Sequence, residues 1–326
     1  MIAASNSGPS NRRVAELLLD RGAVPDDHDL YLAGFAHDRH QLLALLIAHR
    51  PNLNEIAEQA LAAPISNGDT EIARLLLEAG ADPRRYRDDD GQPRPVIGAA
   101  IRAGCDTEFL ELLLTHRADP NATGPDGRSP YQLATAAGRT DLAELLRRHG
   151  VTDSATGIDR FLSACRRADR AEAQQQLDND PGLLNRLADD ERAAIIRAAE
   201  AGDTAAVTLM LDLGFLLETR GNNGATPLHA AAYSGSADTV RHLLARRADI
   251  EARDTTWHST PLDWALVGSG ERPQSNPNPD WLDTVQALLD AGAATDELSL
   301  SPDDPKPPSP EVAALLGARA DRQSSQ

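Results

Sequence analysis

Residues Asn222 to Arg253 read NNGATPLHAAAYSGSADTVRHLLARRADIEAR, and this stretch decides the fold. Thr226 is placed to cap the start of a helix, because its hydroxyl can accept a hydrogen bond from an otherwise unpaired backbone N–H. Pro227 follows at the first helical position, where its missing donor costs nothing. Gly235 can take the left-handed conformation that ends a helix. The stretch therefore predicts a short helix, a tight turn, a second amphipathic helix and an extended return.

This pattern resembles the ankyrin repeat, whose signature is a Thr-Pro-Leu-His block in a unit of about 33 residues. Thr226 and His229 match the two positions whose side chains help to hold the first helix in that family. The resemblance implies an all-α solenoid of stacked helix-turn-helix units with short β-hairpin fingers. It also implies a protein that binds other proteins through its concave face and finger tips.

The second-helix motif, an apolar run closed by glycine or a substitute, recurs along the chain. Most of the intervals lie near the ankyrin period, and two long intervals imply insertions. We therefore expect about nine repeats within residues 1–295. The expected closing positions are Gly22, Arg50, Gly80, Arg117, Gly150, Asp180, Gly214, Arg247 and Gly292.

Two segments interrupt this period. Tyr86 to Pro95, YRDDDGQPRP, lengthens one finger, and residues 268–280, GSGERPQSNPNPD, have the composition of a loop between the two helices of the last full repeat. Residues 296–310 form a proline-rich connector. Residues 311–326 are expected to form a short capping helix, Glu311–Ala318, which covers the open end of the stack, and a frayed tail.

Composition and charge limit the classes of partner. Hydrophobic residues make up 41% of the chain but aromatic residues only 3%, which favours many thin helix contacts over one bulky core. The net charge of −18 disfavours a nucleic-acid or anionic-membrane partner, because phosphates would be repelled. No apolar run approaches the roughly 20 residues of a membrane span. We expect a monomer whose protein partner is basic rather than acidic.

The cysteines and basic residues indicate the cellular setting. Cys105 and Cys165 lie far apart, each where a helix is expected, and form neither a metal motif nor a disulfide framework. A reducing cytoplasm is the simplest interpretation, and no charged-then-apolar leader opens the chain. Lys306 is the only lysine among 32 basic residues, which indicates a GC-rich bacterial genome.

Histidines are the first candidates for chemistry. We expect His229 to be a hydrogen-bonded structural residue rather than a catalytic base, because it belongs to the Thr-Pro-Leu-His block. Three others stand at the ends of second helices, where a partly protonated imidazole interacts favourably with the helix dipole. These are His49, His116 and His149.

Metal and cofactor motifs are weak in this sequence. His28, His37 and His40 lie near one another in the chain, but a nearby cysteine and an i,i+4 pair are both missing. Asp88 to Gly91 resembles half of a calcium loop without its alternation or closing glutamate. No phosphate-binding, dinucleotide-binding or hydrolase motif is present. We therefore expect no metal, no cofactor and no catalytic residues.

The resemblance places a binding surface at the fingers and at the exposed residues of the first helices. The candidates in the best-matching repeat are finger residues and the pair before the turn glycine. Those in other repeats occupy equivalent inner positions. The full set is Tyr86, Arg102, Asp126, Arg128, Arg166, Arg167, Asn222, Asn223, Tyr233, Ser234, Trp257 and His258.

Trp257 and His258 stand out because their finger carries one extra residue. An exposed tryptophan on a rigid tip is the kind of residue that dominates the energetics of an interface. Alternatively, Trp257 folds over Trp264 or over the insertion that follows. The sequence leaves both interpretations open.

Three functions are compatible with these patterns. The first is a non-catalytic scaffold or adaptor that binds a partner protein. The second is an enzyme or small-molecule site in the groove with residues 268–280 as a lid, which predicts a deep pocket with converging histidines or carboxylates. The third is an inhibitor or immunity-type protein for a basic partner, which is a special case of the first.

Overall fold

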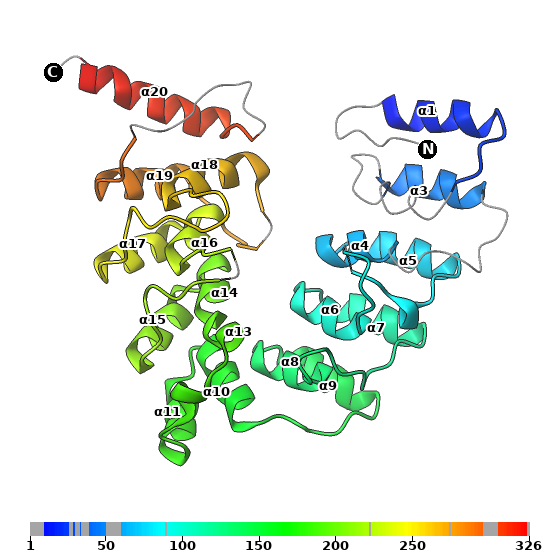
Figure 1. The fold of residues 1–326 in the computed structure, drawn as a ribbon, viewed down its shortest axis with the longest axis horizontal. Coiled ribbons are helices and arrows are strands. Elements are labelled where there is room, and N and C mark those ends of the chain that lie inside the picture. The colour runs from blue at the N-terminus through cyan, green and yellow to red at the C-terminus, as the bar shows by residue number, and fades with distance from the viewer. Residues whose placement is uncertain are drawn as a thin grey trace. The chain divides into compact units, whose positions relative to one another are not determined.

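The computed structural model describes residues 10–25, 29, 33, 39–49, 60–88, 90–221, 223–273, 275–295 and 306–324. The chain divides into two compact units, unit 1 (Met1–Asp159) and unit 2 (Arg160–Gln326). Described secondary structure is helical apart from one isolated antiparallel bridge between Arg87 and Pro93 (Figure 1). The predicted all-α fold is therefore confirmed. Within the described part of the chain, none of the helices has the length and apolar character needed to cross a membrane.

Unit 1 is built from two rows of helices. The first helices of successive repeats, α4, α6 and α8, contact one another in chain order. The second helices α1, α3, α5, α7 and α9 form the other row in the same way (Figure 1). Their bounds are α1 (Ser10–Leu19), α3 (Arg39–Ala48), α4 (Ala62–Asn67), α5 (Thr70–Glu78), α6 (Val96–Arg102), α7 (Thr107–Thr115), α8 (Pro130–Ala136) and α9 (Thr140–Arg148), with a 3-10 turn, η2 (Pro83–Arg85), after α5.

Unit 2 repeats this arrangement. The first helices α14, α16 and α18 form one row, the second helices α15, α17 and α19 form the other, and α20 packs against α19. The last contact fits the predicted capping role. The bounds are α10 (Gly157–Arg166, which crosses the unit boundary), α11 (Arg170–Asn179), α12 (Leu183–Arg186), α13 (Asp189–Arg192), α14 (Ala194–Glu200), α15 (Thr204–Leu213), α16 (Pro227–Tyr233), α17 (Ala237–Ala245), α18 (Pro261–Glu271), α19 (Trp281–Asp290) and α20 (Pro310–Ser324).

Helix α16 begins as its sequence predicts. The Thr226 hydroxyl accepts from the backbone N–H of His229, and His229 Nδ1 accepts from the backbone N–H of Thr226 at 3.2 Å. His229 is fully buried, and its Nε2 lies 3.1 Å from the carbonyl oxygen of Ser259 in the next finger. His229 thus holds the start of α16, as the resemblance implied, and also joins this repeat to the next. Ser129 and Thr260 cap α8 and α18 with the same geometry.

The predicted closing positions of the second helices can be compared with the observed helix ends. Most of them adopt the left-handed conformation that ends a helix. They are Gly22 (φ 87°), Gly80 (108°), Arg117 (70°), Gly150 (85°), Gly214 (108°), Arg247 (67°) and Gly292 (98°). Asp180 is extended instead, with φ −146°. Arg50 lies outside the described residues, so the total of nine repeats remains a prediction.

Polar side chains join the second helices of successive repeats. Arg74 bonds Glu108 at 2.9 Å, and Arg246 bonds Asp212 at the same distance, each pair 34 residues apart. These pairs are solvent-exposed, so water screens them and each contributes little to stability. They fix the register of neighbouring repeats more than they stabilise the stack.

The C-terminal segments differ from expectation. Helix α18 continues through Glu271 and ends at Arg272 in the left-handed conformation (φ 50°), so residues 268–271 are helical rather than a loop. Helix α20 begins at Pro310 and runs to Ser324, well beyond the predicted end at Ala318. Both segments carry glycines or polar residues that favour a loop or a tail by composition. Packing against neighbouring elements decides the conformation of residues 268–271.

Both cysteines are buried thiols. Cys165 lies in α10 as predicted, whereas Cys105 lies in the turn after α6, with its Sγ 3.5 Å from the carbonyl oxygen of Ile65. Burial raises the pKa of each thiol to about 12. Among the described residues, no cluster of three or more His, Cys, Asp or Glu side chains could hold a metal ion. His28 and His37 lie outside that part.

Candidate protein-binding surface

Asp254 organises the finger that precedes α18. Its side chain is 1% exposed and accepts from the backbone N–H groups of Thr256 (2.8 Å), Trp257 (2.6 Å) and Ser259 (3.1 Å). Trp264 Nε1 donates a fourth hydrogen bond at 2.9 Å. Burial raises the pKa of Asp254, but the Trp257 amide and the other donors outweigh this and hold it below its usual range. The carboxylate therefore fixes the conformation of the whole finger tip.

Three aromatic side chains form a row beside this finger, which we name the aromatic row: Tyr233, Trp257 and Trp264. The Trp264 ring lies 5.9 Å from Trp257 and 5.8 Å from Tyr233, edge to face in both cases. Trp257 nevertheless remains 63% exposed. Trp257 therefore packs against Trp264, as the second interpretation expected, and still presents most of its surface to solvent, while its role as an interface residue remains a prediction.

Carboxylates border the aromatic row at the C-terminal ends of the first helices. The Tyr233 hydroxyl donates to Glu271 Oε2 at 2.6 Å, and Glu271 Oε1 accepts from Lys306 Nζ at 2.7 Å. Burial, with help from the charges of Glu271 and Glu200, raises the pKa of the Tyr233 phenol. Burial also raises the pKa of Glu200, which accepts a hydrogen bond from Ser275. Two carboxylates therefore lie at this end of the row, and one of them is paired with Lys306.

The insertion packs along the end of α16. Asn276 is buried and donates to the Ser234 carbonyl oxygen at 3.1 Å and to Ser236 Oγ at 2.9 Å. The backbone N–H of Asp280 donates to the carbonyl oxygen of Gly235 at 2.8 Å. These bonds hold residues 275–280 against the turn between α16 and α17. This part of the insertion therefore packs against the neighbouring repeat through several hydrogen bonds.

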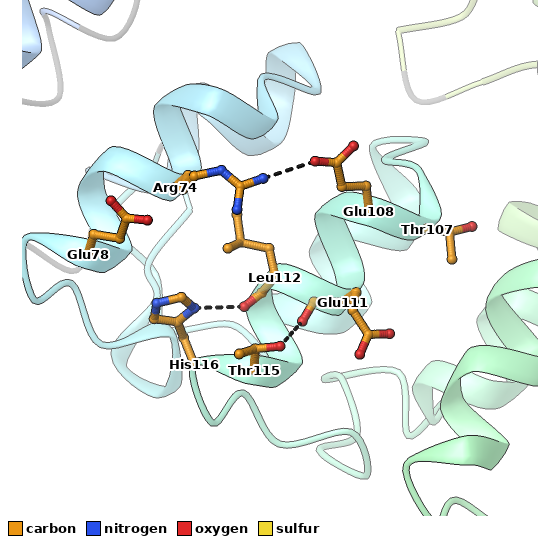
Figure 2. A pocket seen from close by; sticks show the side chains of 8 residues that line it. All are labelled: Arg74, Glu78, Thr107, Glu108, Glu111, Leu112, Thr115 and His116. Atoms are coloured by element: carbon orange, nitrogen blue, oxygen red, sulfur yellow. Dashed lines mark hydrogen bonds and ion pairs between the residues drawn. The ribbon is translucent and has the colours of Figure 1, made fainter.

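Two cavities are lined by residues of unit 1. Each has a volume of about 490 Å³. One lies on α5 and α7, and its walls include Arg74, Glu78, Glu111 and His116 (Figure 2). Figure 2 shows His116 Nδ1 turned to the Leu112 carbonyl oxygen, 2.9 Å away, rather than to a carboxylate. The other is lined by residues 144, 147, 148 and 150–153.

Unit 1 brings three predicted binding residues together. Arg102, at the end of α6, forms an ion pair with Asp126 of the next finger at 2.5 Å. Asp126 also accepts from the backbone N–H of Arg128 at 3.2 Å. The Arg128 side chain forms a half-buried ion pair with Asp159, which is 3% exposed. Arg102 and Asp126 are accessible, whereas Arg128 mainly holds the finger in place.

The arginines at the end of α10 have different environments. Arg166 is partly buried, and its Nη1 is buried without a hydrogen-bond partner in the described structure. Burial lowers its pKa. Arg167 is exposed and pairs with Glu172 at 2.5 Å and with Asp169 at 3.7 Å. Arg167 is therefore the more accessible of the two.

Two predicted binding residues are buried, and the prediction that they meet a partner is wrong. Tyr86 is 5% exposed, and Ser234 is fully buried and hydrogen-bonded to Ser236. Asn223 uses its backbone carbonyl to accept from Thr255 of the next finger at 2.9 Å, while His258 is exposed on the finger tip. Asn222 lies outside the described residues.

Four residues of this surface are missing from the sequence-based candidates: Asp254, Trp264, Glu271 and Lys306. The sequence did contain a signal for Trp264, because this residue directly follows the Thr-Pro-Leu-Asp block and lies four positions, or one helical turn, after Thr260. The sequence contained no signal for the pair of Lys306 and Glu271, because these residues lie 35 positions apart in the chain. Their proximity depends on how the C-terminal segment folds back onto α18.

Two family models that match this chain agree with this architecture. A family model described as "Ankyrin repeats (3 copies)" matches residues 161–254, and one described as "Ankyrin repeat" matches residues 60–89. A transient receptor potential cation channel subfamily A member 1 homolog from Caenorhabditis elegans is 28% identical over 134 residues, which are 40% of this chain and 11% of that protein. The chain thus spans about a tenth of that relative. The crystal structure of the human ASB11 ankyrin repeat domain aligns with 68% of this chain and 96% of its own, at 20% identity and a TM-score of 0.39.

Proposed function

Because this chain is an ankyrin repeat protein, we propose that it is a non-catalytic scaffold that binds a partner protein through the fingers and first helices. Ankyrin repeats are generally protein-interaction modules, and stacked repeats present extended surfaces for this purpose. Neither matched family model describes a catalytic domain. In unit 2 we place the contact on the aromatic row and on His258. Arg102, Asp126 and Arg167 are the further candidates.

The observation that carries this proposal is the state of Trp257. Trp257 is 63% exposed and belongs to a group of three neighbouring aromatic side chains, and grouped exposed apolar surface of this kind is typical of interaction sites. The four hydrogen bonds to Asp254 hold its finger in one conformation before binding, so little conformational entropy is lost when a partner docks. Rigid, exposed tryptophans of this kind are typical interface hot spots.

Capture from native extract tests the proposal. Immobilised wild-type chain is compared with Trp257→Ala and with Leu282→Ala, in which an exposed apolar residue is removed from α19 instead. Loss of a hot-spot residue typically costs 2 kcal/mol or more, so recovery of the partner should fall about thirtyfold for Trp257→Ala. Leu282→Ala should match wild type. Equal recovery of the same protein by all three chains would show that the row is not the contact.

We also propose that the partner is basic and that the chain acts as a cytoplasmic monomer. The net charge of −18 and the carboxylates beside Tyr233 support a cationic partner. Electrostatic attraction of this kind weakens as salt shortens the Debye length from about 30 Å at 0.01 M to about 8 Å at 0.15 M. Affinity for the captured partner should therefore drop over this range. Light scattering at micromolar concentration measures the oligomeric state.

A further inference from the structure

The C-terminal segment places a cation on the carboxylate that borders the aromatic row. Lys306, the only lysine in the sequence, lies with its Nζ 2.7 Å from Glu271 Oε1, and Glu271 Oε2 accepts from the Tyr233 hydroxyl at 2.6 Å. The phenol thus orients the carboxylate toward the ammonium group. In this chain, a lysine side chain therefore binds at this end of the aromatic row.

The backbone that follows Lys306 packs against α18. A Cβ atom at Gly270 would lie 2.2 Å from the carbonyl oxygen of Pro307, so only glycine allows this approach. The backbone N–H of Ser309 donates to Ser269 Oγ at 2.9 Å. Residues 306–309, Lys-Pro-Pro-Ser, are not helical. An irregular, proline-rich segment with a basic residue is therefore what the last turn of α18 binds.

The Lys306 contact is weak enough to be exchanged. The side chains of Lys306 and Glu271 are 59% and 35% exposed, and water screens an ion pair of this kind. A competing cation needs further contacts to displace an intramolecular one, whose effective concentration is in the millimolar range for a short tether. Trp257 and Trp264 offer those contacts, because their rings attract cations and pack against proline.

We propose that Glu271 and Tyr233 form the binding site for a lysine or arginine side chain within a proline-containing segment of the partner protein, and that Lys306 occupies this site when no partner is bound. The inference rests on the proposed function, since it names the chemistry of the partner at the same surface.

A synthetic peptide tests this directly. The probe is a fluorescein-labelled peptide of four Lys-Pro-Pro triplets, and the control peptide carries glutamine in place of each lysine. Anisotropy titrations use the full chain as wild type, Lys306→Gln, Glu271→Gln and, as a matched control, Asp290→Asn on α19. Circular dichroism confirms that each variant is folded.

The variants should shift affinity in opposite directions. Lys306→Gln should bind the basic peptide up to about fivefold more tightly, which is the upper value for one exposed ion pair. Glu271→Gln should weaken binding by at least the same factor, and Asp290→Asn should match wild type. Reductive ¹³C-methylation adds a second readout, since the single lysine gives one side-chain NMR signal that should move to its free position when peptide is added.

Several results would overturn the inference: no binding of the basic peptide by Lys306→Gln, equal binding of the glutamine peptide, or equal affinity of Glu271→Gln and wild type. Its failure is distinguishable from failure of the proposed function. Capture that depends on Trp257 but not on Glu271 refutes only the cation site. Peptide binding with the predicted pattern, but no protein captured through Trp257, refutes only the scaffold.

Discussion

Gly268 of α18 lies against the backbone of Tyr233 in α16, so close that a Cβ atom at Gly268 would stand 1.9 Å from the Tyr233 carbonyl oxygen. Two neighbouring first helices thus meet backbone to backbone at this point. The same carbonyl accepts from Trp281 Nε1 at 3.0 Å. The end of α16 is therefore packed directly against α18 and is also hydrogen-bonded to Trp281.

Substitution of Gly268 should reveal this contact. Gly268→Ala should lower the free energy of unfolding by about 1–3 kcal/mol, because overpacking forces the two helices apart. Gly317→Ala is the matched control, since Gly317 is also helical but a Cβ there would meet nothing within 4 Å. That change should stabilise by about 0.5–1 kcal/mol through helix propensity. Urea denaturation measures both, and equal midpoints would contradict the close approach.

Stability should depend on pH through His229. Burial lowers its pKa from 6.5, and its Nδ1 must stay unprotonated to accept from Thr226. Protonation therefore favours the unfolded chain. The contribution of His229 is fully present above pH 6.5 and is lost as the pH falls from there through the lower pKa of the folded state.

Urea midpoints at pH 7.5 and pH 5 measure this effect. His229→Gln should be less stable than wild type at pH 7.5 and should lose less on acidification. Leu282→Ala, which removes an exposed side chain that does not titrate, should keep the wild-type difference between the two pH values. A His229→Gln chain as sensitive to pH as wild type would exclude this residue as the cause.

Removing one partner of the ion pair between Arg128 and Asp159 should lower the free energy of unfolding far more than removing one partner of an exposed pair on the second helices. The two side chains are 17% and 3% exposed. Asp159→Asn leaves a largely buried guanidinium without its carboxylate, which should cost about 3 kcal/mol. Arg74→Ala, which breaks the exposed pair with Glu108, should cost less than about 1 kcal/mol. Denaturant titration separates these values, and similar costs would refute the argument from burial.

Asp254 should control partner binding without touching the partner, because it is 1% exposed. Asp254→Asn weakens the hydrogen bonds that hold the Trp257 finger. Bonds to a charged group are worth about 1.5–3 kcal/mol, so affinity for the captured partner should fall at least tenfold. Asp249→Asn, an exposed turn aspartate in the same repeat, should bind normally. Unchanged affinity in Asp254→Asn would mean that finger rigidity is irrelevant.

The local features of the repeats were predictable from the sequence because they depend on neighbouring residues. Thr226, Pro227 and Gly235 specify a helix start and end within a few positions, and Arg117 and Arg247 follow from the period alone. The site itself was less predictable. The burial of Ser234 depends on Asn276, 42 residues away. The cation on Glu271 likewise comes from a distant segment.

The prediction of a loop at residues 268–271 was wrong because the conformation of this segment also depends on distant parts of the chain. Glycine and serine favour a loop when only the local sequence is considered. In the folded chain Gly268 and Gly270 are required inside a helix, because one meets α16 and the other meets the carbonyl oxygen of Pro307. The tertiary contact, and not intrinsic propensity, determines the conformation of this segment.

The two buried thiols make this chain suitable for site-directed chemistry. Cys105 and Cys165 are 2% and 0% exposed, and a pKa of about 12 leaves both protonated and unreactive at neutral pH. A cysteine introduced by Leu282→Cys or by Thr256→Cys, which keeps Trp257, would then be the one that maleimides and photo-crosslinkers modify. A reagent attached at the finger tip could trap even a short-lived neighbour in a cell extract, with no need to mutate the native cysteines first.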